Sequence, residues 1–144
     1  MGINVGAGFK KQVLSFIYVD DLTDIVFKAI NKGIARKEYF VSDGYAYTDD
    51  EFNKIVQIAL NKKRVIRLKI PLFIVKALSV VSEKMGELLN QPVTFNTDKY
   101  KIMKQRNWAC DITPLKKELD FTPKVHLKEG VEKTIAWYKE KGWL

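Results

Sequence analysis

The chain has only one cysteine and one histidine among its 144 residues. A single cysteine cannot form an intramolecular disulfide, and one cysteine with one histidine falls short of the four ligands of a structural zinc site. We therefore expect neither a disulfide-stapled fold nor a bound metal. A lone thiol is typical of a reducing compartment, so the composition favours a cytoplasmic protein.

Long apolar runs are also missing. The most apolar stretch, "IPLFIVKALSVV", is interrupted by Lys76 and stays short of the roughly 20 residues that cross a bilayer. It indicates a buried helix, and we expect no contact with a membrane. The first residues, "MGINVGAGFKKQ", lack the charged, apolar and small-residue order of a secretory signal.

Acidic residues are outnumbered by basic ones, 17 against 25, which gives a net charge of +8. Such an excess favours anionic partners, which could be nucleic acid, a phosphorylated metabolite or a dinucleotide. The basic residues are scattered among acidic ones along the sequence, and no nucleic-acid-binding motif is present. We therefore expect no nucleic-acid partner.

Hydrophobic residues make up 47% of the chain, enough for the core of a single domain over residues 1–144 without staples. Short β-branched stretches alternate with longer stretches of helical periodicity, which predicts a helix-rich α/β fold with a few short strands. The predicted strands are 13–19, 38–44, 64–70 and 108–112, and the predicted helices begin near residues 21, 48, 72, 97, 113 and 127.

Most of these helices carry a start signal. Asp21, Asn96 and Thr113 are residue types that cap a helix N-terminus, and Thr48 with Glu51 forms a capping box. These signals predict where the helices begin.

Residues 64–89 combine a strand and a long helix. Ile66, Leu68 and Ile70 alternate with Arg67 and Lys69, so one face of this strand is expected to be buried. The helix that follows Pro71 is apolar around most of its circumference, which predicts that it is covered on more than one side.

Three features invite a catalytic interpretation, and each has a simpler one. "GINVGAG" departs from a dinucleotide fingerprint at its third glycine and leads into a strand, so we interpret it as a plain turn. The carboxylates of Asp20, Asp21 and Asp24 are placed to offset the positive end of a helix dipole and the unpaired N–H groups at the helix start. Cys110 would need a base to act as a nucleophile, and we interpret it as a small apolar filler and His126 as a weak helix cap.

Lys104, Arg106 and Trp108 are the candidate substrate-binding residues. Cations beside an aromatic ring could hold a phosphate or a sugar ring. The alternative is a solvated helix end next to a packing tryptophan. We assign no catalytic, cofactor-binding or metal-binding residue to the chain.

Four stretches of the sequence follow one another in a familiar order: "FIYVDDLTDIVFKAI", "YFVSDGYAYTDDEFNKIV", "RLKIP" and "CDITPLKKELDFTPKVHLKEGVEKTIAWYKEKGWL". Together they resemble the C-terminal part of the NAD(P)-dependent epimerases and dehydratases, the extended branch of the short-chain dehydrogenase/reductase family. The N-terminal Rossmann half of that family, with its glycine-rich turn and Tyr-x-x-x-Lys pair, has no counterpart here.

The resemblance implies a substrate-binding portion whose partner is the missing Rossmann domain, with a small-molecule substrate. If the Rossmann half is absent, its former contact surface is exposed, and a homodimer that hides this apolar area is a possible consequence. NAD or NADP would be bound by the parent enzyme and not by these residues, and this portion alone would not be catalytic. It also implies that 38–44 adds a late strand to the nucleotide-binding sheet, and that Asp120 occupies a helix end where relatives have glycine.

Two departures from the family bear on the substrate. Leu14 stands where enzymes that grip a nucleotide-sugar diphosphate commonly have arginine, and only Lys104 and Arg106 approximate a second phosphate-binding arginine. A nucleotide sugar or a related hydroxyl or keto compound is the first expectation. The alternatives are a substrate domain like that of sterol dehydrogenases or flavonol reductases, and a non-catalytic oligomeric interaction module built on the apolar helix at 72–89.

Overall fold

The computed structural model describes residues 2–144, which form two compact units. Unit 1 consists of the stretch that ends at Gln12 together with Lys63–Asn107, and unit 2 consists of Val13–Lys62 and Trp108–Leu144. Each unit is thus assembled from two separated stretches of the chain. The general prediction of a helix-rich α/β fold with few strands is confirmed.

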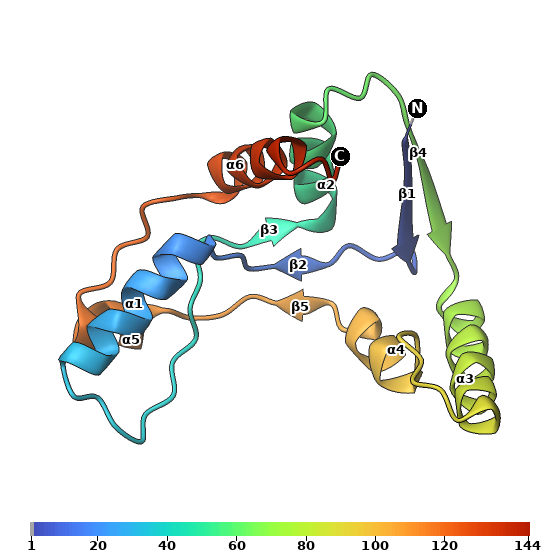
Figure 1. Cartoon of the computed structure of the whole chain (residues 1–144), viewed down its shortest axis with the longest axis horizontal. Coiled ribbons are helices and arrows are strands. Elements are labelled where there is room, and N and C mark those ends of the chain that lie inside the picture. The colour runs from blue at the N-terminus through green and yellow to red at the C-terminus, as the bar shows by residue number, and fades with distance from the viewer. Residues whose placement is uncertain (1) are drawn as a thin grey trace. The chain divides into compact units, whose positions relative to one another are not determined.

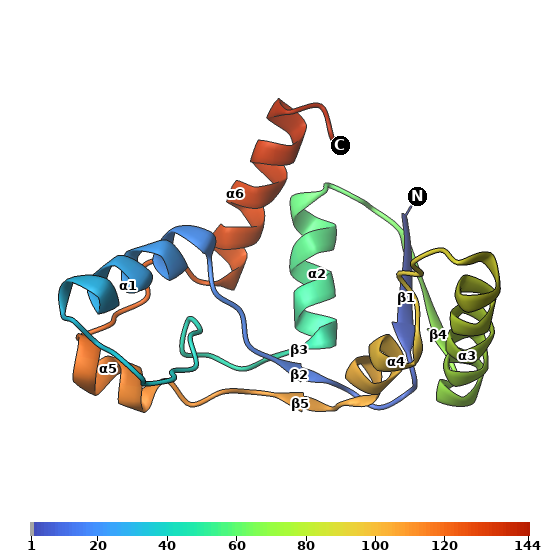
Figure 2. The ribbon, with the colours of Figure 1, turned by 60° about the horizontal axis from the view of Figure 1, so that its bottom comes forward.

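Unit 1 is built around two parallel strands, β1 (Gly2–Ala7) and β4 (Val65–Ile70), which lie side by side in Figures 1 and 2. The interpretation of "GINVGAG" as a plain turn is therefore wrong, because β4 supplies a partner 63 residues later in the chain that local sequence does not reveal. Pairing places Ile3 beside Ile66 and Val5 beside Leu68. All four of these side chains are more than half exposed, so the expected burial is wrong at Ile66 and Leu68, while Ile70 is partly buried.

Helix α3 (Leu72–Leu89) spans the residues that the sequence indicated, and α4 (Thr97–Lys104) packs against it. The Asn96 side chain accepts a hydrogen bond from the backbone N–H of Lys99 at 3.0 Å, which confirms the predicted cap. Position 86 of α3 requires glycine because Val93 packs closely against it, and a Cβ there would stand 2.6 Å from Cγ1 of Val93. Only part of α3 is covered, because Val75, Ser79 and Gly86 are buried while most of its large apolar residues are exposed.

Unit 2 holds the main hydrophobic core. Helix α1 (Val19–Asn31) lies beside α5 (Thr113–Leu119) in Figures 1 and 2. Leu115 and Leu119 lie four residues apart on one face of α5, and each is 1% exposed. The core cluster consists of Ile25, Ile112, Leu115, Leu119 and Phe121, with Ile17, Ala29, Ile34, Tyr39, Val41 and Cys110 packed against it.

A second helix pair in unit 2 consists of α2 (Asp49–Ala59) and α6 (Leu127–Glu140), which contact each other. The capping box is confirmed, since Thr48 Oγ1 accepts from the N–H of Glu51 at 3.2 Å and the Glu51 carboxylate accepts from the N–H of Thr48 at 2.7 Å. On α6, Lys133 and Glu129 form the expected ion pair at 2.7 Å.

The strands of unit 2 are shorter than predicted. β3 (Tyr47–Thr48), β2 (Val13–Leu14) and β5 (Asn107–Trp108) form a small sheet in that order. The predicted strand at 108–112 therefore ends at Trp108, and that at 13–19 ends at Leu14. The stretch 38–44 is not a strand, because no strand in residues 2–144 pairs with it and a β-strand exists only through its pairing.

Asp21 does not cap α1, contrary to prediction. The helix begins two residues earlier, and the buried Asp21 carboxylate accepts hydrogen bonds from the backbone N–H groups of Lys124 and Val125 at 3.0 and 2.9 Å. Asp24 instead forms an ion pair with the Lys124 ammonium at 2.5 Å. Asp21 and Asp24 thus fix the loop before α6 to α1. Asp20 and Asp21 also lie in the first turn of α1, where their charges offset the positive end of the helix dipole, as predicted.

The prediction for α5 is wrong at the start of the helix and confirmed at its end. Thr113 does not cap this helix, and its backbone N–H donates to the Asp111 carboxylate at 2.8 Å. The hydrogen bond with the Thr113 side chain, followed by the one with its backbone N–H, lowers the pKa of Asp111. At the other end, Asp120 adopts a left-handed conformation with φ 49°, which bears out the expectation of a glycine-like position.

Candidate functional site

Of the three predicted substrate-binding residues, Lys104 and Arg106 belong to unit 1 and Trp108 belongs to unit 2. Lys104 is exposed in the last turn of α4, where a cation also complements the helix dipole. Trp108 lies in β5 with 44% of its surface exposed, as a side chain that contacts a ligand requires. The assignment of these residues to a substrate stays a prediction.

Arg106 has a structural role within unit 1. Its Nη1 donates to the carbonyl oxygen of Lys10 at 3.0 Å and approaches that of Ala7 at 3.5 Å. The guanidinium lies against Gly8, where φ is +75° and a Cβ would stand 2.5 Å from Nη2. Arg106 therefore holds the loop that follows β1, and any ligand contact would use the remaining edge of the guanidinium.

The loop after β1 does not form a dinucleotide phosphate site. Such a site needs a strand that passes through a glycine-rich turn directly into a helix, whose N-terminal N–H groups receive the phosphates. Residues 8–12 are followed by β2 and not by a helix. The described residues at this turn thus do not fit the pyrophosphate of NAD.

Cys110 is placed as a packing residue, as predicted. Its side chain packs against the core of unit 2, and its backbone N–H donates to the Ser15 hydroxyl at 3.3 Å. His126 occupies the N-cap position of α6 without forming a side-chain cap. Its Nδ1 instead lies 3.8 Å from the Asp43 carboxylate, and its ring meets that of Tyr45 edge-on.

Asp43 is a buried carboxylate that the sequence analysis did not single out. It accepts hydrogen bonds from the Tyr45 backbone N–H at 3.1 Å and from the Tyr47 hydroxyl at 2.6 Å. Burial, followed by the hydrogen bond and the negative charge of Asp43, raises the pKa of Tyr47 to about 12. Tyr47 is thus held as a neutral donor, and the Ser-Asp-Gly turn at 42–44 was the only local signal for this arrangement.

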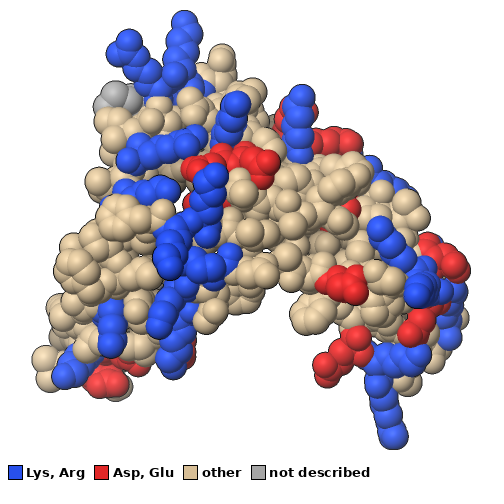
Figure 3. Space-filling view, turned by 180° about the vertical axis from the view of Figure 1, so that it is seen from behind, with Lys and Arg blue, Asp and Glu red and all other residues tan. Residues whose placement is uncertain are grey.

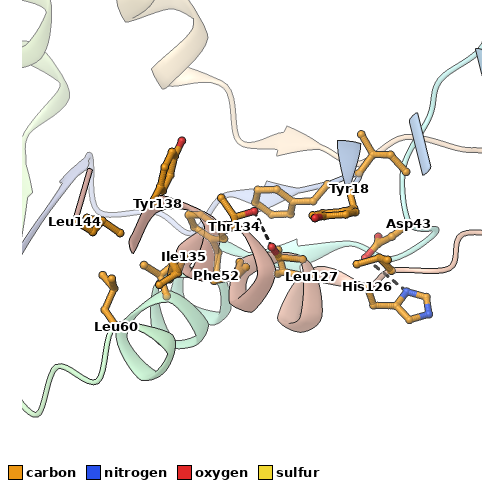
Figure 4. A pocket seen from close by; sticks show the side chains of 16 residues that line it. Tyr18, Asp43, Phe52, Leu60, His126, Leu127, Thr134, Ile135, Tyr138 and Leu144 are labelled. Carbon is orange, nitrogen blue, oxygen red and sulfur yellow. Dashed lines mark hydrogen bonds and ion pairs between the residues drawn. The ribbon is translucent and has the colours of Figure 1, made fainter. Parts of the chain in front are cut away.

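Unit 2 contains an apolar cavity of about 440 Å³, which Figure 4 shows from close by. Its volume is within the range of pockets for small ligands. Asp43 and His126 lie at one end, and the Thr134 hydroxyl donates to the Gly130 carbonyl at 2.7 Å within α6. The apolar lining comes mainly from Phe16, Phe52, Val56, Leu60, Leu127, Val131, Ile135, Tyr138 and Leu144.

This lining suits an apolar group rather than acid–base chemistry. Helical periodicity identifies the apolar stripes of α2 and α6, but a sequence does not reveal that two stripes leave a space between them. Among residues 2–144, no three His, Cys, Asp or Glu side chains are grouped as a metal site requires. None of the helices in these residues is long and apolar enough to cross a membrane.

Comparisons with known proteins give one curated relative and several solved structures. No family model matches the chain. An uncharacterized protein, y4nL, of Sinorhizobium fredii (strain NBRC 101917 / NGR234) is 23% identical over 141 residues, which are 96% of this chain and 39% of that protein.

Two of the similar structures are enzymes of known type. The dTDP-glucose 4,6-dehydratase of Bacillus anthracis, in complex with NAD, superposes with a TM-score of 0.65 at 16% identity over 96% of this chain and 35% of its own. The UDP-glucose 4-epimerase of Thermotoga maritima, with UDP-glucose, gives a TM-score of 0.62 at 17% identity over 96% of this chain and 35% of its own.

The chain thus spans between a third and two fifths of the length of the proteins it matches. Identities below 20% in the two enzymes establish a shared fold and no more. The predicted resemblance is confirmed at that level: this chain has the fold of the C-terminal portion of the NAD-dependent epimerases and dehydratases of the extended short-chain dehydrogenase/reductase family.

Proposed function

We propose that this chain is the substrate-binding portion of an NAD(P)-dependent epimerase or dehydratase that acts on a nucleotide sugar or a related hydroxyl or keto compound. The observation that carries the proposal is the superposition of 96% of the chain on about a third of an NAD-bound dehydratase. A Rossmann domain would supply the cofactor site and the catalytic pair, because the turn after β1 does not fit a dinucleotide. These residues alone would then not be catalytic.

Lys104, Arg106 and Trp108 are the proposed substrate contacts. An exposed lysine and a guanidinium are suited to a phosphate, and an exposed indole is suited to a sugar or base ring. Unit 1 supports an anionic substrate further, because it carries twelve Lys and Arg against three Asp and Glu, a net charge of +9. Such a charge raises the local concentration of a diphosphate.

A more apolar alcohol or ketone is the alternative substrate, as in the sterol-dehydrogenase-like and flavonol-reductase-like branches. It is favoured by Leu14 in β2, which stands where a diphosphate-binding arginine is expected. The net charge of unit 1 argues against this alternative.

The proposal is tested by titrating the isotope-labelled chain with NAD, NADP and UDP-glucose and following backbone amide shifts by NMR. We expect UDP-glucose to shift amides of residues 104–108 and neither dinucleotide to bind tightly. The matched variant Arg106→Lys keeps the charge but loses the forked geometry, so it should weaken the response. Tight NAD binding, or hydride transfer catalysed by this chain alone, would overturn the proposal.

A non-catalytic interaction module is the second candidate function. It is supported by the many large apolar side chains that residues 2–144 leave exposed, in α1 as well as in α3. Contiguous exposed apolar surface on a folded protein commonly marks a contact with another chain. Light scattering tests it, since a monomer at high concentration argues against such a surface.

A further inference from the structure

The apolar cavity of unit 2 ends at a buried carboxylate, as Figure 4 shows. The side chain of Asp43 is 1% exposed, and Nδ1 of the half-exposed His126 lies 3.8 Å from it. All other lining residues are aliphatic, aromatic, glycine or threonine, and in the part of the chain that the structure describes the lining includes no lysine or arginine. The cavity is thus apolar along its walls and negatively charged at one end.

The Asp43 carboxylate has room for a further hydrogen-bond donor. A carboxylate has about four lone-pair sites, and the described residues fill two of them, through the Tyr45 N–H at 3.1 Å and the Tyr47 hydroxyl at 2.6 Å. Both of these donors are neutral, and His126 is beyond hydrogen-bond distance. Because a buried charge is costly until a charge of opposite sign pairs with it, a cation in the cavity would stabilise Asp43.

The size of the cavity indicates what kind of molecule would fill it. Its volume of about 440 Å³ is about three times that of an apolar cavity that holds one benzene molecule, which is about 150 Å³. One inserted side chain would therefore leave much of it empty. A stretch of polypeptide would bring backbone N–H and C=O groups, for which this lining has few partners. A compact apolar molecule of two or three rings suits the space better.

The charges of unit 2 do not oppose a cation. Unit 2 carries thirteen basic and fourteen acidic residues, a net charge of −1. The Lys133 ammonium lies 5.4 Å from the centre of the Tyr18 ring at the cavity wall, but it is paired with the Glu129 carboxylate at 2.7 Å. Unit 1 differs, since it has a net charge of +9 and many basic side chains are visible on the face drawn in Figure 3. Cations are thus favoured at the cavity and anions at unit 1.

We propose that this cavity binds an organic ammonium ion with an apolar body. The ammonium donates to the Asp43 carboxylate, and the apolar body lies between α2 and α6. The same carboxylate disfavours fatty acids and other apolar anions, because two negative charges would face each other in an apolar space. Lys104, Arg106 and Trp108 do not line this cavity, so the inference does not rest on the binding of a nucleotide sugar.

The first test compares three compounds that share a naphthalene ring and differ in the polar group: naphthylmethylamine, naphthylmethanol and naphthoic acid. The whole isotope-labelled chain is titrated with each, and backbone amide shifts are followed by NMR. We expect the amine to shift amides of α2 and α6 and to bind at least about tenfold more tightly than the acid, with the alcohol between them. Residues 104–108 should not respond, and UDP-glucose should not displace the amine.

The second test removes the charge without changing the shape of the site. Asp43→Asn should weaken binding of the amine at least about tenfold and abolish its advantage over the alcohol. The matched control is Glu140→Gln, which neutralises an exposed carboxylate of α6 outside the lining. This control should bind the amine as the native chain does.

The third test fills the cavity. Val131→Phe adds a ring to the lining and should abolish binding of all three compounds, whereas Ala136→Phe adds the same ring at an exposed position of α6 and should not affect it. Circular dichroism checks that each variant keeps its helices. For the native chain, an acid that binds as tightly as the amine, or amide shifts confined to residues outside the cavity, would overturn the proposal. A dissociation constant above about 1 mM for all three compounds would also overturn it.

Discussion

The two units of this chain bury apolar surface to very different extents. Of the nine buried hydrophobic residues in the part of the chain that the structure describes, eight belong to unit 2 and only Val75 belongs to unit 1. The apolar residues of β1, β4 and α3 in unit 1 are instead largely exposed. Unit 2 therefore resembles a small folded domain, whereas unit 1 resembles a layer that needs another layer against it.

Charge separates the two units as well. Unit 1 carries twelve basic and three acidic residues, while unit 2 carries thirteen basic and fourteen acidic ones. Unit 1 alone thus has a net charge of +9 and unit 2 one of −1, so the excess of positive charge resides entirely in the unit with the poorer core. The sequence scatters lysine and arginine along the chain, and folding gathers the excess into one unit. Anionic partners are therefore expected at unit 1.

The largest effect should follow from a cavity in the core of unit 2. Leu115→Ala removes a side chain that is 1% exposed at the centre of that core, and such truncations cost about 2–5 kcal/mol in the free energy of unfolding. Phe73→Ala removes a larger side chain from α3, but one that is 73% exposed, so it should change stability by no more than about 0.5 kcal/mol. Urea denaturation followed by circular dichroism measures both.

Equal losses in the free energy of unfolding from these two substitutions would contradict the difference in burial between the two units. Such a result would mean that Phe73 is buried against a partner, and repeating the titration at a tenfold lower protein concentration would reveal it. A loss that persists on dilution would place the burial within a single chain.

A smaller effect is expected where α1 holds the loop before α6. Asp21→Ala leaves two backbone N–H groups, those of Lys124 and Val125, without their acceptor, and orphaned buried donors cost about 1–3 kcal/mol. Asp24→Ala removes only an exposed ion pair with Lys124, which is worth at most about 1 kcal/mol. Thermal unfolding of the two variants compares them directly. If Asp24→Ala were the more damaging, the assignment of Asp21 as the anchor would be wrong.

Features set by neighbouring residues could be predicted from the sequence. The capping box at Thr48 and Glu51 and the cap at Asn96 follow from side chains within four residues of the backbone groups that they satisfy. The start of α3 follows from Pro71, which directly precedes it. The paired face of Leu115 and Leu119 follows in the same way from helical periodicity.

Features set by distant residues could not be predicted. β1 is a strand because it pairs with β4. The stretch 38–44 is not a strand, because no strand in residues 2–144 pairs with it. Asp21 is a residue type that often caps helices, but its hydrogen-bond partners lie about a hundred residues away in the sequence. The candidate site shares this limit, since Arg106 is engaged by the loop after β1 and the cavity arises between two separate helices.

A helix cap in unit 2 should have an effect smaller than either of those above. Thr48→Ala removes the oxygen that accepts from the Glu51 N–H, and losing such a cap typically costs about 1 kcal/mol. Thr48→Ser keeps the hydroxyl and should stay close to the native chain. Chemical denaturation measures the difference, and a serine variant as unstable as the alanine variant would show that the threonine methyl, and not the cap, is responsible.

The smallest effect concerns Glu118, whose carboxylate joins α5 to the chain around Lys37 and Tyr39. Hydrogen bonds from the Lys37 ammonium and the Tyr39 hydroxyl, each 2.5 Å long, lower the pKa of Glu118. Because the folded-state pKa lies below the unfolded one, the stabilisation is complete above the unfolded value and is lost as the pH falls through the folded value. NMR titration of the side-chain carboxyl carbons should therefore find Glu118 protonating at lower pH in the folded chain than in the urea-unfolded chain. Tyr39→Phe removes one of the two donors and should move the midpoint of Glu118 in the folded chain upward. Coincident midpoints for Glu118 in the folded and the unfolded native chain would show that this contact is not maintained in solution.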